Sequence, residues 1–133
     1  MPDLTPGDAL APFVIQSVSP EAMRTLTALL RDPTPIHFAP EVVEQLGMGT
    51  RVINQGPANV GYVVNGLLTG LPDHELEHLQ VRFLGNVLGE DRVVAGGQVR
   101  DVDDGRATID VWLDVDGGER ALEGVAVVRR RAG

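Results

Sequence analysis

The spacing of apolar residues changes along this chain from a helical period in the first half to alternation in the second. Residues 12–19 are typical of a short strand, and residues 20–32 carry one apolar stripe at helical spacing. Residues 40–47 predict a short second helix that ends at Gly47. Residues 56–72 are apolar on nearly every side and too long for one strand, so they predict a buried central helix. The stripe of the first helix consists of Met23, Leu26, Leu29 and Leu30.

The first helix has clear start and stop signals. Ser19 is placed to cap its N-terminus, and Pro20 suits the first helical position because a missing N–H costs nothing there. Pro33 ends the helix at or before Asp32, since the residue before a proline is pushed out of α geometry. Glycines interrupt the central helix, which predicts that its backbone approaches neighbouring elements closely. These glycines are Gly61, Gly66 and Gly70.

The second half of the chain predicts four strands, at residues 76–84, 91–101, 106–115 and 119–130. Asp/Gly-rich joins between the last three are typical of hairpin turns. The order of one strand, several helices and then four antiparallel strands predicts an α+β fold in which a curved sheet packs around a single helix. We expect one domain over residues 1–133. The inward-facing residues of the third of these strands are predicted to be Ala107, Ile109, Val111, Leu113 and Val115.

Composition and charge narrow the class of protein. The formal net charge is −8, so a nucleic-acid partner is not expected, because phosphate binding requires a basic surface. The absence of cysteine excludes disulfides, thiolate catalysis and cysteine-bound metals. No apolar run reaches the roughly 20 residues of a membrane span, and the first residues lack the basic segment of a secretory signal. We therefore expect a cytoplasmic protein without a membrane partner.

The sequence RDPTPIH at residues 31–37 is the strongest chemical signal in the chain. Pro33 and Pro35 restrict the loop, and an aspartate and a histidine five positions apart on such a loop can converge on one point. Asp32 and His37 could then share a water as a general acid/base pair. The alternative from spacing alone is that Asp32 caps a turn and His37 packs on apolar neighbours.

Gly56 lies where the central helix should begin. A helix N-terminus presents free N–H groups and the positive end of the helix dipole. Pro57 has no N–H, so the amide of Gly56 is the nearest candidate donor to a carbonyl oxygen that gains negative charge. Ordinary helix initiation explains the same glycine when it is considered alone.

Three segments together resemble the MaoC-like hydratases and dehydratases of the hot-dog fold: RDPTPIHF, INQGPANVGYVVNGLLTG and VRFLGNVLGED. The resemblance covers roughly residues 25–100 and includes the D-x4-H loop with its PIH core. It implies hydration of a trans-2-enoyl-CoA thioester, or dehydration of a 3-hydroxyacyl thioester on CoA or acyl carrier protein. Asp32 and His37 would activate the water, and the Gly56 N–H would polarise the thioester carbonyl. The thioester supplies the acidity, so no cofactor is implied.

The chain departs from the family pattern near the start of the central helix. Thr34 replaces the family's asparagine, and Gln55, preceded by Asn54, replaces its histidine. Asn54 and Gln55 would line the substrate pocket, and Arg82 or Arg92 could contact a phosphate of coenzyme A. The departure at Gln55 also resembles the small MaoC-like subunits of steroid side-chain hydratases, in which a catalytic chain pairs with a related non-catalytic one.

A single hot-dog unit leaves a sheet edge unpaired, so we expect a homodimer or a hetero-oligomer with a homologous chain. A non-catalytic, thioester-binding subunit is the rival interpretation, and a thioesterase is a further one by analogy of fold. Metal sites are not expected. The acidic turns at 101–105 and 114–119 lack the full calcium-loop spacing, and His74 and His78 have no third zinc ligand.

Overall fold

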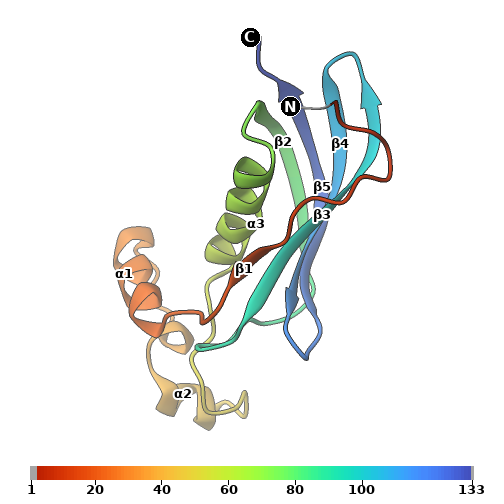
Figure 1. The fold of residues 1–133 in the computed structure, drawn as a ribbon. Helices are drawn as coiled ribbons and strands as arrows, with labels where there is room; N and C mark the ends of the chain where they lie inside the picture. The colour runs from red at the N-terminus through yellow and green to blue at the C-terminus, as the bar shows by residue number, and fades with distance from the viewer. Residues whose placement is uncertain (1–2, 133) are drawn as a thin grey trace.

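A five-stranded antiparallel sheet curves around one long helix, as Figure 1 shows. The computed structural model describes residues 3–132. Its helical elements are α1 (Pro20–Leu30), the 3-10 turn η1 (Pro35–His37), α2 (Pro40–Gln45) and α3 (Gly56–Gly70). Its strands are β1 (Phe13–Ile15), β2 (His74–Phe83), β3 (Val93–Asp103), β4 (Arg106–Val115) and β5 (Arg120–Arg130). The strand order β1-β3-β4-β5-β2 places β1 and β2 at the two edges of the sheet.

The predicted start of α1 is confirmed. The Ser19 hydroxyl accepts a hydrogen bond from the backbone N–H of Ala22 at 3.1 Å, and Pro20 occupies the first helical position. The helix stops at Leu30 because Arg31 adopts a left-handed conformation with φ of 51°. The loop that follows contains η1, which the sequence pattern did not predict.

Helix α3 lies against the sheet with Val63 and Leu67 buried at the contact. Gly66 makes the close approach expected of a helical glycine, because a Cβ atom there would lie 3.2 Å from Phe13 Cβ and 3.4 Å from Ala95 Cβ. A Cβ at Gly61 or Gly70 would meet no atom within 4 Å. Only one of the three helix glycines is therefore required by the packing.

The strands of the second half follow the predicted alternation. In β4 the residues at 107, 109, 111 and 113 are buried, and Val115 packs at the margin of the core. The predicted turn between β3 and β4 is a two-residue hairpin, with Asp104 at φ of 48° and Gly105 at φ of 79°. These two left-handed residues match the twist of the flanking strands.

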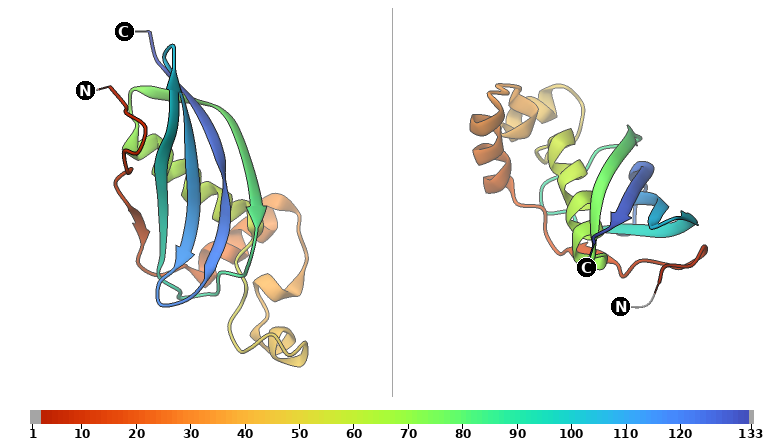
Figure 2. Two further views of the ribbon diagram at one scale, coloured as in Figure 1. Left: turned by 90° about the vertical axis from the view of Figure 1, so that its right-hand side faces the viewer. Right: turned by 90° about the horizontal axis from the view of Figure 1, so that it is seen from above.

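The molecule has three layers, namely the sheet, then α3, then α1 on the side of α3 away from the sheet (Figure 2). Within α1 only Met23 is buried, and among the named elements the helix mainly contacts η1. In residues 3–132 no helix is both long and apolar enough to cross a membrane. The loosely covered α1 and the loop behind it therefore form one end of the molecule, beyond the sheet.

Replacing Gly124 of β5 with alanine should disrupt the pairing of β5 with β2. A Cβ at this position would overlap the Gln80 carbonyl oxygen and lie 3.0 Å from Val81 Cα, both in the backbone of β2. We expect the free energy of unfolding to fall by about 1–3 kcal/mol, as for other overpacked sites. Urea unfolding of the variant measures this. Gly61→Ala is the control, and because its Cβ enters open space it should raise helix stability by up to about 1 kcal/mol. Equal stability of the two variants would contradict the predicted clash.

Candidate active site

Two hydrogen bonds join the loop after α1 to the segment that leads into α3. The Ile53 N–H donates to the Ile36 carbonyl at 2.8 Å, and His37 Nδ1 lies 2.6 Å from the Ile53 carbonyl oxygen. His37 is therefore held beside the start of the central helix, although 16 residues separate it from Ile53. The rigid loop predicted from Pro33 and Pro35 is fixed in place by backbone contacts.

The contact with Ile53 determines the tautomer of the His37 ring. A carbonyl oxygen only accepts hydrogen bonds, so Nδ1 must carry the proton. In the neutral imidazole Nε2 is then a hydrogen-bond acceptor, and it lies 3.5 Å from Asp32 Oδ2. This separation is too long for a direct hydrogen bond. Two acceptors thus face each other, an arrangement that one water molecule can satisfy by donating one hydrogen to each.

Thr34 holds the other oxygen of the Asp32 carboxylate. Asp32 Oδ1 accepts hydrogen bonds from the Thr34 hydroxyl at 2.6 Å and from the Thr34 N–H at 3.2 Å. These two bonds keep the pKa of the Asp32 carboxyl below its ordinary value of 3.8. Burial opposes them to a smaller extent, and the positive charge that His37 carries when its ring is protonated lowers the pKa slightly further. Oδ2 is left to face His37, and the side chain remains 35% exposed, so water can reach it. Asp32 is therefore an oriented, persistently ionised acceptor.

The start of α3 provides a hydrogen-bond donor. The Gln55 carbonyl accepts from the N–H groups of Ala58 and Asn59, whereas the Gly56 N–H donates to no acceptor within residues 3–132. The ring of half-exposed Phe83, at the end of β2, lies over this glycine, and a Cβ on Gly56 would be 3.2 Å from Phe83 Cζ. A free N–H at a helix N-terminus, covered on one side by an aromatic ring, suits an oxygen that gains negative charge.

Asn54 and Gln55 are buried, with exposed fractions of 5% and 1%. Asn54 donates to Asn59 Oδ1 at 2.8 Å, and its hydrogen bond with the hydroxyl of Tyr62 partly offsets the rise that burial causes in the pKa of Tyr62. Gln55 Nε2 donates to the Met23 carbonyl at 2.8 Å and to Thr27 Oγ1 at 3.1 Å. Gln55 thereby joins α1 to the start of α3, and the Asp32 N–H joins the same turn of α1 through the Thr27 carbonyl at 3.0 Å.

A groove of about 470 Å³ lies between α1 and α3. Leu26 and Leu29 line its α1 side, and the small residues Ala58 and Gly61 line its α3 side. Because Asn54 and Gln55 line it as well, the groove begins at the segment that also positions His37. The remaining lining residues are Ala22, Thr25, Tyr62 and Asn65.

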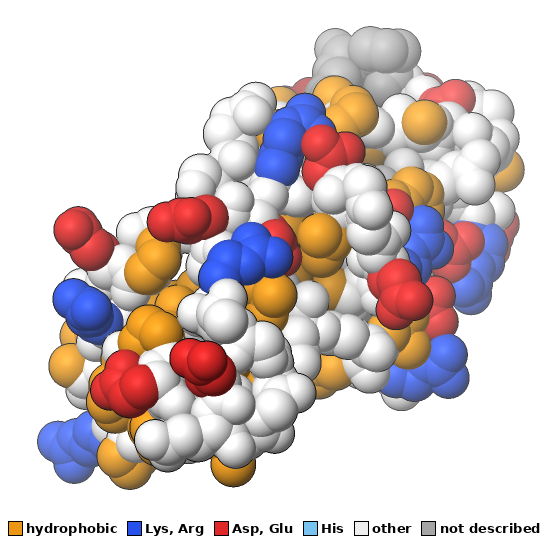
Figure 3. Space-filling view, turned by 90° about the horizontal axis from the view of Figure 1, so that it is seen from below, with side chains coloured by type: hydrophobic (Ala, Val, Ile, Leu, Met, Phe, Trp, Pro, Cys, Tyr) orange, Lys and Arg blue, Asp and Glu red, His pale blue; other side chains and the backbone are white. Residues whose placement is uncertain are grey.

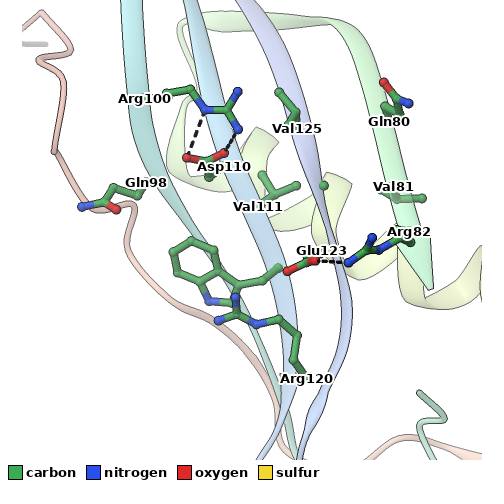
Figure 4. A pocket seen from close by; sticks show the side chains of 12 residues that line it. Gln80, Val81, Arg82, Gln98, Arg100, Asp110, Val111, Arg120, Glu123 and Val125 are labelled. Atoms are coloured by element: carbon green, nitrogen blue, oxygen red, sulfur yellow. Dashed lines mark hydrogen bonds and ion pairs between the residues drawn. The ribbon is translucent and has the colours of Figure 1, made fainter. Parts of the chain in front are cut away.

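The structure does not bring Arg82 to this site. Arg82 lies on the face of the sheet opposite α3 and forms an ion pair with Glu123 at 2.9 Å, as Figure 4 shows. It lines a hollow on that outer face. Arg92 is paired with Asp116 at 3.1 Å. Within one chain, the structure therefore groups Asp32, His37 and Gly56 near Asn54 and Gln55, and leaves both arginines out.

The two other histidines also lie apart from the site. His74 is buried at the start of β2, where burial and then the charge of Arg130 lower the pKa of its ring. His78 is exposed further along the same strand. Residues 3–132 contain no group of three or more His, Asp or Glu side chains that could hold a metal ion.

Sequence reasoning missed three contributors to the site. Thr34 could have been found, because an aspartate often accepts a hydrogen bond from the N–H two residues later. The Ile53 carbonyl gives no sequence signal, since any residue offers the same backbone group. Phe83 lies 27 positions from Gly56 in the sequence, and only the curvature of the sheet brings its ring to the helix start.

No family model matches the chain, and no curated protein matches its sequence. Solved structures do match its fold. An (R)-hydratase from A. caviae involved in PHA biosynthesis has a TM-score of 0.86 at 23% identity, over 96% of this chain and 98% of that one. The ChsH1–ChsH2 complex from Mycobacterium tuberculosis has a TM-score of 0.83 at 16% identity, over 96% and 98%. The C-terminally truncated HadBC (3R-hydroxyacyl-ACP dehydratase) complex, also from M. tuberculosis, has 0.74 at 18%, over 92% and 96%.

These similarities establish the fold. The long helix α3 on a five-stranded antiparallel sheet is the hot-dog arrangement of these hydratases and of structures described as MaoC-like dehydratases. The α+β hot-dog fold expected from the sequence is therefore confirmed. What this particular chain does rests on its own site residues.

Replacing Thr34 with alanine should raise the pKa of Asp32 towards 3.8, because the hydroxyl makes the largest contribution to the lowered value. In Thr34→Ser the hydroxyl is kept, so the Asp32 carboxyl should titrate as it does in the wild type. Carboxyl carbon NMR across an acid titration measures both. A lowered folded-state pKa stabilises the fold above pH 3.8, and this stabilisation disappears as the pH falls through the folded-state pKa. The alanine variant should thus be less stable at neutral pH but not in strong acid. An unchanged Asp32 titration would contradict this assignment.

Proposed function

We propose that this protein is a MaoC-like hydratase that adds water to a trans-2-enoyl-CoA thioester. The observation that carries the proposal is the pair of acceptors, His37 Nε2 and Asp32 Oδ2, that face each other at 3.5 Å. His37 is hydrogen-bonded to Ile53, three residues before the free N–H of Gly56. A water about 2.8 Å from both acceptors would be held by two hydrogen bonds. Its remaining lone pairs would then be directed at a bound substrate.

The two side chains have different parts in the proposed reaction. Because Thr34 keeps the pKa of Asp32 low, the carboxylate is a weak base, so it orients the water and stabilises positive charge on the ring. His37 Nε2 takes one proton from the water as the water oxygen bonds to Cβ. The π electrons move towards the thioester carbonyl. Nε2 then returns the proton to Cα, and the ring is again neutral with its proton on Nδ1.

The Gly56 N–H would bind the thioester oxygen during this step. A preorganised donor aimed at a developing negative charge stabilises the transition state more than the ground state. Its position at the start of the 15-residue helix α3 adds the positive end of the helix dipole. The proposed addition needs no cofactor, because the thioester itself makes Cα acidic.

The groove between α1 and α3 would hold the acyl group. Its volume of about 470 Å³ and the small residues Ala58 and Gly61 in its wall support a bulky acyl group, such as a steroid side chain, over a short linear one. Leu26 and Leu29 offer an apolar surface for it, and Leu29 is 76% exposed in the single chain. An apolar acyl group would cover this surface.

We further propose that the chain acts as a dimer, either with itself or with a homologous chain. Strand β2 is ten residues long and forms an edge of the sheet. A long unpaired edge readily pairs with another strand, and β2–β2 pairing would extend the sheet across two chains. The similarity to the ChsH1–ChsH2 and HadBC complexes, each named as a complex of two chains, supports a homologous partner as much as a second copy.

The test is hydration of crotonyl-CoA and of a steroid-like enoyl-CoA by the purified chain. Asp32→Asn and His37→Ala should each reduce kcat/KM by about a hundredfold or more, the usual contribution of a positioned acid/base group. Asp101→Asn is a matched control, because Asp101 is exposed on β3 and should leave the rate unchanged. Loss of the enoyl-thioester absorbance measures turnover, and circular dichroism checks the fold.

Activity that appears only on addition of a homologous MaoC-like chain would assign the protein to a hetero-oligomeric hydratase. Full activity of Asp32→Asn would remove the proposed mechanism. If the chain binds the thioester but no turnover occurs even with the homologous chain present, the protein is a thioester-binding subunit and not a hydratase. A higher rate on the enoyl-acyl carrier protein than on the CoA thioester would change the carrier and keep the chemistry.

Narrowing the groove should discriminate between acyl groups. Gly61→Leu introduces a side chain where a Cβ meets no atom within 4 Å, so the fold should tolerate it. We expect kcat/KM to fall at least about tenfold for the steroid-like thioester and to remain unchanged for crotonyl-CoA. Gly70→Leu, also in open space on α3 but outside the groove, is the control. An equal effect on both substrates would show that the acyl group binds elsewhere.

A further inference from the structure

The arginines of this acidic protein are almost all neutralised by neighbouring carboxylates. Nine of the eleven have a carboxylate oxygen within 4.0 Å. On the outer face of the sheet, for example, Arg82 pairs with Glu123 and Arg100 with Asp110 (Figure 4). A positive charge that remains unpaired is therefore exceptional in the described part of the chain.

The two arginines outside this set are Arg24 and Arg31, and no carboxylate in residues 3–132 lies within ion-pair distance of either. Both belong to the same element, since Arg24 is in α1 and Arg31 is its C-terminal cap. They are exposed, and they lie at the end of the molecule that carries α1 and α2, where Figure 3 shows charged side chains among hydrophobic ones. Arg31 immediately precedes Asp32 of the candidate site.

Arg31 occupies a position that favours glycine. Its φ of 51° is left-handed, a conformation that costs most L-residues about 1 kcal/mol or more. Helices commonly end with glycine or asparagine in this conformation. Here a long cationic side chain occupies this position instead, at the start of the loop that contains Asp32 and His37. No ion pair within residues 3–132 offsets the cost of this conformation.

Arg24 lines a cavity of about 180 Å³ behind the loop. Phe38, which follows His37, borders the same cavity, together with the apolar residues Pro20, Pro40 and Val52. Glu90 also lines it but does not pair with Arg24. The cavity thus has partly apolar walls and two guanidinium groups, of which Arg51 is paired with Asp91 and Arg24 is not. It lies directly beside the loop that carries the proposed acid/base pair.

We propose that Arg24 and Arg31 bind the phosphate groups of the carrier that delivers the thioester, which deepens the proposed function and rests on it. Guanidinium groups bind phosphate oxygens through paired, charge-assisted hydrogen bonds. Two unpaired positive charges on a surface of net charge −8 would also give an anionic carrier one attractive place to approach. The shared chemistry is the phosphate of a phosphopantetheine arm, whose source is either coenzyme A or an acyl carrier protein.

The experiment compares crotonyl-CoA, crotonyl-acyl carrier protein and crotonyl-pantetheine, which lacks phosphate. Arg24→Gln and Arg31→Gln should each raise KM about tenfold or more for a phosphate-bearing thioester, because a charge-assisted hydrogen bond is lost. Turnover at saturation should persist, since this contact is the same in ground and transition states. Neither variant should change the kinetics of crotonyl-pantetheine. Arg100→Gln, in which a paired arginine is removed from the outer face, should leave all three substrates unaffected.

A KM effect confined to the CoA thioester identifies coenzyme A as the source of the phosphate, and one confined to the carrier-protein thioester identifies the carrier protein. Equal effects on all three substrates, or none on any, would overturn the inference. If the wild type hydrates no thioester, either alone or with a homologous chain, the proposed function fails separately. Calorimetry with free coenzyme A then decides the inference. The inference is supported if Arg24→Gln and Arg31→Gln each weaken the binding of coenzyme A about tenfold while Arg100→Gln leaves it unchanged. It is overturned if coenzyme A does not bind, or if the two variants bind it as tightly as the wild type.

Discussion

The hydrogen bond from His37 Nδ1 to the Ile53 carbonyl is the contact on which the site depends. It fixes the ring in the tautomer that leaves Nε2 free, and it aims Nε2 at Asp32. The same residue, Ile53, holds the loop a second time through its N–H to the Ile36 carbonyl. Because both bonds use backbone atoms of Ile53, they link the loop that carries Asp32 and His37 directly to the segment before α3. The geometry of the proposed chemistry is therefore set by the backbone.

Helix α1 supports both the loop that carries His37 and the start of α3. Gln55 donates to Met23 and Thr27 of α1, and the Asp32 N–H donates to the Thr27 carbonyl. Thr27 thus joins the two ends of the candidate site, although its own side chain faces neither reacting group. The helix contacts α3 sparsely elsewhere, which leaves the groove between them open. One short helix consequently anchors the site, forms a wall of the groove and carries the two unpaired arginines.

The arginines of this chain fall into nine that pair with a carboxylate and two, Arg24 and Arg31, for which residues 3–132 provide no such partner. Cross-strand pairs such as Arg120 with Asp114 cover the outer face of the sheet, where Arg120 also lies 5.0 Å from the ring centre of Trp112. Exposed pairs of this kind contribute little stability individually, but they neutralise the arginines of that face, namely Arg82, Arg100 and Arg120. Positive charge is therefore available to a ligand mainly at α1, beside the loop that contains Asp32 and His37.

Most elements of this protein could be predicted from the sequence, because their signals are local, whereas the short turn η1 could not. Alternation in β4, the Asp-Gly turn before it and the cap at Ser19 each depend on residues within a few positions. Residue type and proline spacing also made Asp32 and His37 candidate site residues, and the expected start of the central helix made Gly56 one. Which of these groups lie close together became clear only from the folded chain. The Ile53 carbonyl gives no signal in the sequence, because every residue has the same backbone group. Phe83 reaches Gly56 only because the sheet is curved. Arg82 was expected to contact the substrate, yet the strand pleat directs it to the other face, towards Glu123. Contacts between distant segments depend on sheet curvature and register, which no local pattern encodes.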